Sequence, residues 1–452
     1  MKQQKYLLAR SCRVEEQPSL ISRGVIRWRV LTQAERFFCV CIVLTPLWWV
    51  IGWAYILPIW LTVVAIYEIR CNGTLDLKTP SLSVISAIAF GLYRAICTSF
   101  NSPEVKPSFL LAPIASFCCL GLVIWYCQSK DIRIRIEVVG WAFSILVVQM
   151  FLVWIVAQLI LGAPYYNPPL SLFGQLTDKA QRFIPGVGNT NYLMPYLPDD
   201  KIATGLARFS FFFPGPEALA LLVGFMGLLA LDLKNRSWSV VLLLGCTFVL
   251  FLSATRSNWI TFPLILIIRF LIVNSKRVKS WLIFCLIAVV SFLLFSLPPA
   301  TDFIVNTFIN TAESTGNARA DSTEVRALIY QRTWEAITNE SEDFVFGRGV
   351  PGLTVLPGYA PAQVGSHSFL LGTLLYRSGF LGTSIFATFW ISLLLWFYQT
   401  RKNRPICSFL IILYITITFS VMELESTTPL ILILCAALKT NSNPIAGSML
   451  HA

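Results

Sequence analysis

The sequence predicts an all-α fold, a polytopic membrane bundle of about 12 transmembrane helices with a periplasmic loop domain. The chain of 452 residues is 56% hydrophobic and only 13% charged, which is more apolar surface than a soluble domain needs. The apolar residues fall in runs of about 20, the length of a membrane-spanning helix. Lysine and arginine gather in short connections between these runs, as in the cytoplasmic loops of membrane proteins.

The chain begins with a basic segment, residues 1–36, which leads into an apolar stretch without a small-residue cleavage site. We therefore expect a cytoplasmic tail rather than a cleaved signal. Residues 37–67 are too long for one ordinary span, and Pro46 and Gly52 interrupt them near the middle. We interpret them as a tight hairpin of two helices, although a single broken span remains open.

The remaining spans follow from the apolar runs. They are predicted at 81–100, 109–127, 138–162, 211–231, 238–254, 258–274, 281–298, 369–398, 406–421 and 428–438. The spans form three groups, over 37–162, 208–298 and 369–438, and a cytoplasmic tail covers 439–452. With both termini inside, basic clusters such as 130–135 and 401–404 lie in the cytoplasm, and the short outer connections hold few basic residues.

Two long polar segments are predicted on the periplasmic side, 163–207 and 299–368. The first is rich in Pro, Gly, Asn and Tyr, which indicates an irregular lid with short helices. The second contains a predicted helix at 322–338, because Asp321 and Glu324 resemble a capping box. The apolar positions repeated along this helix are Ala327, Tyr330, Trp334 and Ile337.

His367 is one of only two histidines, and it stands where the second loop gives way to an apolar run. We interpret the following stretch as a helix that includes this histidine. One face of it would carry His367, Leu371, Leu374 and Ser378. Small residues that would allow close helix packing are Gly372, Ser378, Gly379 and Gly382. An imidazole at a membrane boundary can accept a proton, and the alternative is a histidine that merely caps the helix.

The second loop is net acidic, so any anion there would be held by individual arginines through their bidentate fork. Arg326 is the preferred candidate because Tyr330 and Thr333 follow it on the same helical face. Arg332 lies on another face, and an ordinary surface pair with Glu335 explains it as well.

Arg208 and Arg256 stand at outer membrane boundaries, where a charge is usually paired or faces an aqueous cavity. The alternatives are snorkelling toward headgroups and, for Arg208, a local ion pair with Glu217. Arg94 could belong to the same cavity or be a structural partner for Glu217, and Arg377 could project toward the interface or pair within the bundle.

Together these residues favour glycosyl transfer from a lipid-linked diphosphate. The arginines would stabilise the diphosphate as it leaves, a task that a metal ion performs elsewhere. His367 would take a proton from an acceptor sugar hydroxyl, with Glu324 as an alternative base. No P-loop, Rossmann glycine pattern or HExxH motif occurs, so we expect no cofactor and no metal. The net charge of +12 lies mainly between spans and does not indicate a nucleic-acid partner.

Residues 200–400 resemble the O-antigen ligase and O-antigen polymerase superfamily. The resemblance rests on Ser253–Ser257, on Arg326 with Tyr330, on Gly347-Arg348-Gly349, and on His367 followed by Gly379 and Gly382. It implies a GT-C-like helical bundle and a polyprenyl-diphosphate-linked oligosaccharide donor, used without metal or nucleotide. Ser368 stands where ligases commonly have Asn, and the sequence LLYRSGFLG is similar to that of exopolysaccharide polymerases.

We therefore expect a glycosyltransferase of the bacterial inner membrane that acts on the periplasmic face in surface or extracellular polysaccharide synthesis. Its partners would be the lipid-linked donor, a glycan or lipid-glycan acceptor and membrane lipids. The expected catalytic residues are His367 and Arg326, and the expected substrate-binding residues are Arg208, Arg256, Tyr330 and Glu217. The alternative is a transporter of a small anion such as bicarbonate, or of a lipid-linked glycan, although no repeated halves are visible.

Overall fold

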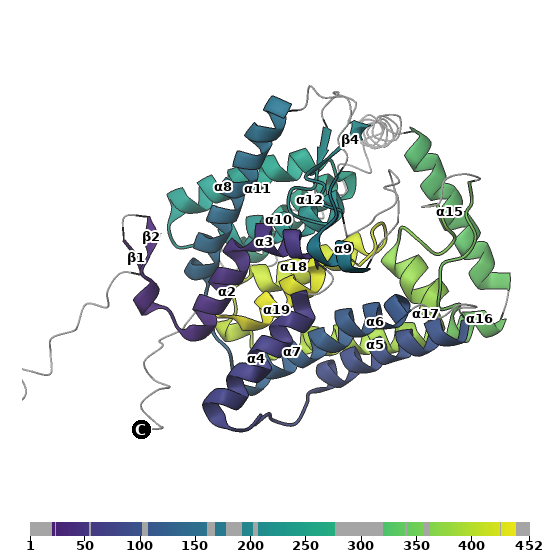
Figure 1. Cartoon of the computed structure of the whole chain (residues 1–452), viewed down its shortest axis with the longest axis horizontal. Coiled ribbons are helices and arrows are strands. Elements are labelled where there is room, and N and C mark those ends of the chain that lie inside the picture. The colour runs from purple at the N-terminus through teal and green to yellow at the C-terminus, as the bar shows by residue number, and fades with distance from the viewer. Residues whose placement is uncertain are drawn as a thin grey trace, which may run out of the picture.

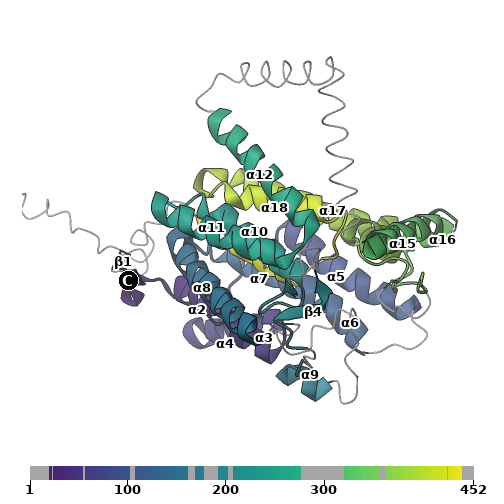
Figure 2. The same ribbon diagram turned by 90° about the horizontal axis from the view of Figure 1, so that it is seen from above.

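The structure is a computed structural model. It describes residues 20–22, 24–53, 56–101, 107–160, 168–177, 192–201, 207–275, 320–339, 341–356, 362–424 and 426–439. In these ranges the chain is a helical bundle with only small two-stranded sheets (Figures 1 and 2). The predicted all-α, polytopic membrane fold is confirmed. The predicted span at 281–298 and most of both predicted tails lie outside the described residues.

The N-terminal part breaks at the two predicted positions. After the short β1 (Ile21–Ser22), β2 (Val25–Ile26) and η1 (Trp28–Val30), helix α2 covers Gln33–Val43. It bends by 63° into α3 (Thr45–Ile51), whose first turn holds Pro46. Gly52, at φ +127°, ends α3 before α4 (Ile56–Asn72). The bend and the glycine separate three short helices where the sequence predicts two.

The next helices are long enough to cross a membrane. Helix α5 covers Leu82–Asn101, and α8 covers Ile136–Ile160 after the short β3 (Ile134–Arg135). Between them, α6 (Pro107–Pro113), the π-helical η3 (Ile114–Cys118) and α7 (Cys119–Ser129) form one continuous span. The following irregular segment contains α9 (Leu172–Thr177) and the antiparallel pair β4 (Tyr196–Lys201) and β5 (Ala207–Phe209).

Helix α10 (Pro216–Ala230) lies at the centre of the bundle, and every one of its residues except Glu217 is buried. It starts at Pro216 and not at 211 as predicted, because Pro214 and Gly215 interrupt the chain and a proline at the first helical position fits there. Helices α11 (Arg236–Ser253) and α12 (Arg256–Ser275) follow.

The helix predicted at 322–338 is α15 (Ala320–Asn339), and α16 (Ser341–Phe346) follows it. Both lie at one end of the bundle, beside the start of α17 (Figures 1 and 2). The predicted apolar face is only partly right. Ile329, Thr333 and Ile337 are buried, whereas Ala327 is exposed and Trp334 is 56% exposed.

The C-terminal part comprises η4 (Phe369–Tyr376), a π-helix that continues into α17 (Arg377–Gln399), then η5 (Arg401–Asn403), α18 (Cys407–Thr418), α19 (Thr427–Ala437) and β6 (Leu438–Lys439). The predicted close packing of small residues is confirmed. Gly379 lies against the backbone of Gly347, and Gly382 lies against the ring of Tyr93 on α5.

Among the described residues, six helices are long and apolar enough to cross a membrane, or seven if the bent α2–α3 pair counts as one span. Helices α10, α18 and α19 are apolar but shorter. The predicted number of twelve spans stays a prediction.

Candidate active site

Arg208 is fixed by a set of hydrogen bonds at the end of β5. Its Nε donates to the carbonyl of Ser253 at 2.9 Å, and one Nη donates to Glu217 Oε1 at 2.6 Å and to Thr255 Oγ1 at 3.4 Å. The Arg208 side chain is only 9% exposed, and that of Glu217 is 24% exposed. The local ion pair considered from the sequence is therefore present, and it orients the guanidinium group.

Arg256 begins α12 directly after a tight turn. The turn is made by Ala254, whose φ is +52°, and Thr255. Ser257, the next residue, contacts the Met422 sulfur at 3.3 Å and so ties this helix end to the connection between α18 and α19. The charge of Arg256 lies close enough to Arg208 and Arg326 to interact with both.

Arg326, on α15, lies close to the other two arginines of the predicted site. Its charge interacts electrostatically with Glu217, Arg256, Tyr330 and His367. Among the described residues its guanidinium group forms no hydrogen bond or ion pair. Three cationic groups thus share one polar region with the Glu217 carboxylate, and an arginine in this position has donors available for a ligand.

His367 lies in the loop before the helix and not on it. Its backbone has φ +64°, in the left-handed region. The helix starts at Phe369, and the Ser368 hydroxyl caps it by accepting a hydrogen bond from the Leu371 amide at 3.1 Å. The predicted shared helical face is therefore wrong for the histidine. The capping alternative is also wrong, since Ser368 is the cap.

Helix α15 holds the histidine loop in place. The Tyr330 hydroxyl donates to the carbonyl of His367 at 3.1 Å, and Thr333 Oγ1 accepts from the Gly365 amide at 2.8 Å. The predicted face of Arg326, Tyr330 and Thr333 thus does point toward the histidine. A non-glycine residue at positive φ is strained, and these contacts are what stabilise it.

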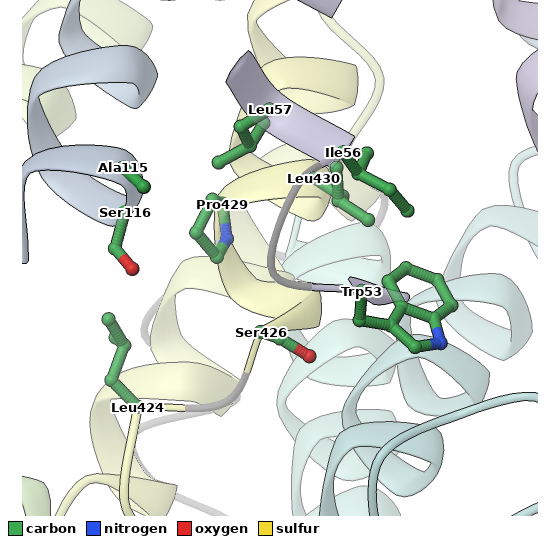
Figure 3. A pocket seen from close by; sticks show the side chains of 9 residues that line it. All are labelled: Trp53, Ile56, Leu57, Ala115, Ser116, Leu424, Ser426, Pro429 and Leu430. Carbon is green, nitrogen blue, oxygen red and sulfur yellow. The ribbon is translucent and has the colours of Figure 1, made fainter. Parts of the chain in front are cut away.

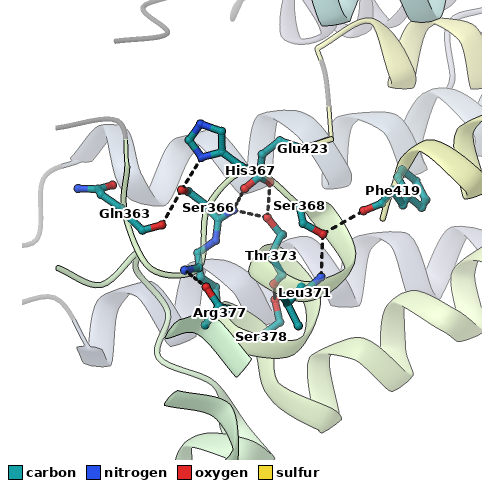
Figure 4. A network of polar contacts seen from close by, with 12 residues as sticks. Gln363, Ser366, His367, Ser368, Leu371, Thr373, Arg377, Ser378, Phe419 and Glu423 are labelled. Atoms are coloured by element: carbon teal, nitrogen blue, oxygen red, sulfur yellow. Dashed lines mark hydrogen bonds and ion pairs between the residues drawn. The ribbon is translucent and has the colours of Figure 1, made fainter. Parts of the chain in front are cut away.

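The hydrogen bonds of Ser366 decide which ring nitrogen of His367 carries a proton. The Ser366 hydroxyl lies 2.6 Å from the carbonyl of Gln363 and 2.7 Å from His367 Nδ1 (Figure 4). A hydroxyl has one proton, and the carbonyl can only accept it. Ser366 therefore donates to Gln363 and accepts from Nδ1–H. In the neutral ring this leaves Nε2 with a free lone pair.

The ionisation of the site favours this neutral ring. Burial lowers the pKa of His367 below its ordinary value of 6.5, and the charge of Arg326 lowers it further, against a smaller opposing effect of Glu217. Burial raises the pKa of the Tyr330 hydroxyl, which stays protonated as the donor to the loop. At neutral pH the site therefore contains an uncharged imidazole beside guanidinium groups.

A second polar network supports the start of the helix. Arg377 donates to Glu423 at 2.5 Å, and Glu423 accepts from the Thr373 hydroxyl at 2.6 Å (Figure 4). Arg94 on α5 donates to Ser378 at 3.3 Å. Its suggested pairing with Glu217 is therefore wrong, and Arg377 pairs within the bundle.

A cavity of about 70 Å³ lies between the start of α4, η3 and the start of α19 (Figure 3). It is lined by Trp53, Ile56, Leu57, Ala115, Ser116, Leu424, Ser426, Pro429 and Leu430, and by none of the predicted site residues. A buried water occupies roughly 10–15 Å³ on this measure, so the cavity suits a few waters and is too small for a sugar. The buried Ser426 hydroxyl has no hydrogen-bond partner among the described residues, and it would bond one of these waters.

The six predicted site residues come from four separate segments, and their charges and rings lie close to one another around Arg326 and not at this cavity. Sequence reasoning missed Ser366 and Glu423. The signal for Ser366 was its place directly before the histidine, whereas nothing local indicated Glu423, which pairs across 46 residues of sequence. Within the described residues, no three His, Cys, Asp or Glu side chains come together to hold a metal.

In a comparison with known proteins and families, part of the chain matches one family model. No curated protein matches the chain. Residues 238–387 match the family described as O-antigen ligase, a region that contains Arg256, Arg326, Tyr330 and His367 but neither Arg208 nor Glu217. The family indicates glycosyl transfer of the O-antigen ligase and polymerase type. This match supports the membership of the chain in the O-antigen ligase and polymerase superfamily.

Proposed function

We propose that the chain transfers or polymerises oligosaccharide from a polyprenyl-diphosphate donor, on the periplasmic face of the bacterial inner membrane. The product would be a surface or extracellular polysaccharide. The proposal rests on the meeting of three arginines with a histidine whose Nε2 is free to accept a proton. The family match supports the same class of reaction.

In the proposed reaction, His367 is the general base. A hydroxyl of the acceptor glycan attacks the anomeric carbon of the donor sugar while Nε2 takes the hydroxyl proton. The bond between the anomeric carbon and the diphosphate oxygen breaks, and the polyprenyl diphosphate leaves with the bonding pair. The imidazolium that forms keeps its Nδ1–H bond to Ser366, which becomes stronger because the donor is now charged.

Each of the three arginines would stabilise the leaving diphosphate in a different way. Arg208 is held by Glu217 and the Ser253 carbonyl, so it is preorganised and its position does not depend on the substrate. Arg326 has no such partners among the described residues, and its five donors suit phosphate oxygens. Arg256, whose charge interacts with those of Arg208 and Arg326, adds a third positive charge. Negative charge that develops on the diphosphate is stabilised by all three.

Purified chain in liposomes, supplied with a polyprenyl-diphosphate oligosaccharide and an acceptor glycan, tests the proposal. We expect free polyprenyl diphosphate to appear together with a longer glycan. Arg326→Ala and His367→Ala should abolish both products. The matched control is Arg332→Ala on the same helix, which should retain activity. The Arg332 side chain is 61% exposed and pairs with Glu335.

A normal product yield from His367→Ala would refute the role of the base. Anion flux through liposomes that contain no lipid-linked sugar, without glycan growth when the sugar is supplied, would favour a transporter instead.

A further inference from the structure

The segment from α16 to Gly349 runs along the last turns of α5. The Tyr93 hydroxyl donates to the carbonyl of Phe346 at 2.8 Å, and Asn101, the final residue of α5, reaches the carbonyl of Gly347 at 3.5 Å. Helix α16 also packs against α17, where the rings of Phe344 and Phe380 are stacked 6.3 Å apart. Figure 1 shows α16 beside the ends of α5 and α17.

These contacts place the segment at membrane depth. Helix α5 has 20 residues, which at about 1.5 Å per residue matches the hydrocarbon thickness of roughly 30 Å. Tyr93 lies two turns before its end, about 12 Å along the axis. Phe346, which is bonded to Tyr93, therefore lies level with the acyl chains of the leaflet that contains the C-terminal turns of α5.

The protein itself provides hydrogen-bond partners for most of the irregular backbone after α16. Its carbonyls accept from side chains of α5 or from the following turn: Phe346 from Tyr93 at 2.8 Å, Gly347 from Asn101 at 3.5 Å, and Arg348 from the Val350 amide at 2.7 Å. Its amides donate to backbone carbonyls: Gly347 to Asp343 at 2.8 Å, Arg348 to Tyr376 at 3.0 Å, and Gly349 to Arg377 at 3.0 Å. Non-helical backbone is tolerated in a bilayer only when the protein satisfies it in this way.

Two glycines allow this close approach. Gly347 and Gly349 have φ of +77° and +70°. A Cβ on Gly347 would lie 2.5 Å from the Gly379 amide, and one on Gly349 would lie 2.4 Å from the Cys97 carbonyl. The Gly-Arg-Gly sequence thus serves docking against α5 and α17, and its glycines are required for packing.

Among the described side chains of this segment, the exposed ones at 344–346 are apolar, and Arg348 and Asp343 form a pair. Phe344, Val345 and Phe346 are 45%, 40% and 58% exposed, next to Phe380 at 59% on a membrane-spanning helix. Arg348 forms an ion pair with Asp343 at 2.6 Å. Three consecutive exposed apolar residues are unfavourable in water, whereas a paired charge and an apolar surface suit a lipid boundary.

We propose that residues 341–349 form a lipid-embedded foot, with Phe344, Val345 and Phe346 in contact with phospholipid acyl chains. The occupant is bilayer lipid because the foot is continuous with the lipid-facing surface of α17 and lies level with the last turns of α5. The foot also anchors α15, which directly precedes it and carries Arg326 and Tyr330. The bilayer thereby helps to place two residues of the candidate site.

Photo-crosslinking of the full chain tests the foot. Benzoylphenylalanine replaces Phe346, Phe380 or Arg332 in separate variants, reconstituted in phosphatidylethanolamine and phosphatidylglycerol liposomes. After irradiation we expect a mass increase of one phospholipid at 346 and 380, and none at 332. Absence of a lipid adduct at 346 when 380 gives one would overturn the proposal. A crosslink between two protein chains at 346 would also overturn it, since it would identify a second copy as the occupant.

A second measurement needs no variant. Phe346 and Phe380 are the same residue type and are 58% and 59% exposed, so hydroxyl radicals generated in water report directly on their surroundings. In lipid nanodiscs we expect equal, low oxidation of both. Oxidation of Phe346 at several times the rate of Phe380 would place the foot in water and refute the inference.

Discussion

Replacing Ser366 with Ala tests how the site controls its base. The variant removes the acceptor of His367 Nδ1–H, which lies 2.7 Å away, and the link onward to the Gln363 carbonyl. A hydrogen bond between neutral groups contributes about 0.5–1.5 kcal/mol, and one with a charged donor, as in the proposed transition state, about 1.5–3 kcal/mol. Because the bond is already present in the ground state, kcat loses only the difference, about 1–1.5 kcal/mol, which corresponds to a fall of roughly 5- to 13-fold. The KM for the donor should change little, because the hydrogen bonds of the Ser366 hydroxyl go to Gln363 and His367.

The assay is the initial rate of polyprenyl diphosphate release by purified protein at saturating donor. Ser366→Thr, which keeps a hydroxyl on the same backbone atom, should restore most of the activity. A kcat of Ser366→Ala equal to that of the unaltered protein would refute the tautomer argument. A change in KM alone would also refute it, because it would show that Ser366 acts on binding and not on the base.

Three further predictions follow from the same geometry. In a pH–rate profile, kcat/KM should be at its maximum above the pKa of His367, where the base is unprotonated, and should fall as pH drops through that pKa. Because burial lowers the pKa of His367, the midpoint of this fall should lie below 6.5. Arg326→Lys keeps the charge but loses the fork, so kcat/KM should fall about tenfold or more, while Arg332→Lys should not change it. Gly349→Ala should lower the thermal midpoint more than Gly73→Ala; both residues have φ +70°, but only at Gly349 does the new Cβ meet backbone, at 2.4 Å. Equal midpoints would refute the close approach.

Much of the fold could be predicted because the length of an apolar run fixes the length of a spanning helix. The face of α15 that carries Arg326, Tyr330 and Thr333 was predictable for a similar reason, since neighbours on a helix are three and four residues apart. The hydrogen bonds of Tyr330 and Thr333 to the histidine loop confirm that face. The exposure of Trp334 did not follow from the pattern, because it depends on which surfaces pack against the helix.

The conformation of the histidine loop could not be read from periodicity. An apolar run after His367 predicts a helix, yet the left-handed backbone at this residue depends on contacts with α15, from 37 residues earlier in the sequence. Ser368 before the apolar run was the available local signal, since serine is a preferred helix cap. The pair of Arg377 and Glu423 has no local signal at all, because only the folded bundle brings α17 and the connection before α19 together.

A structure of the complex with an unreactive phosphonate analogue of the lipid-linked donor, determined in nanodiscs by electron microscopy, measures the central claim directly. The account predicts that the two phosphorus-bearing groups contact at least two of Arg208, Arg256 and Arg326, with His367 Nε2 facing the anomeric carbon. An analogue bound away from these residues, with its diphosphate group facing none of the three guanidinium groups, would contradict it.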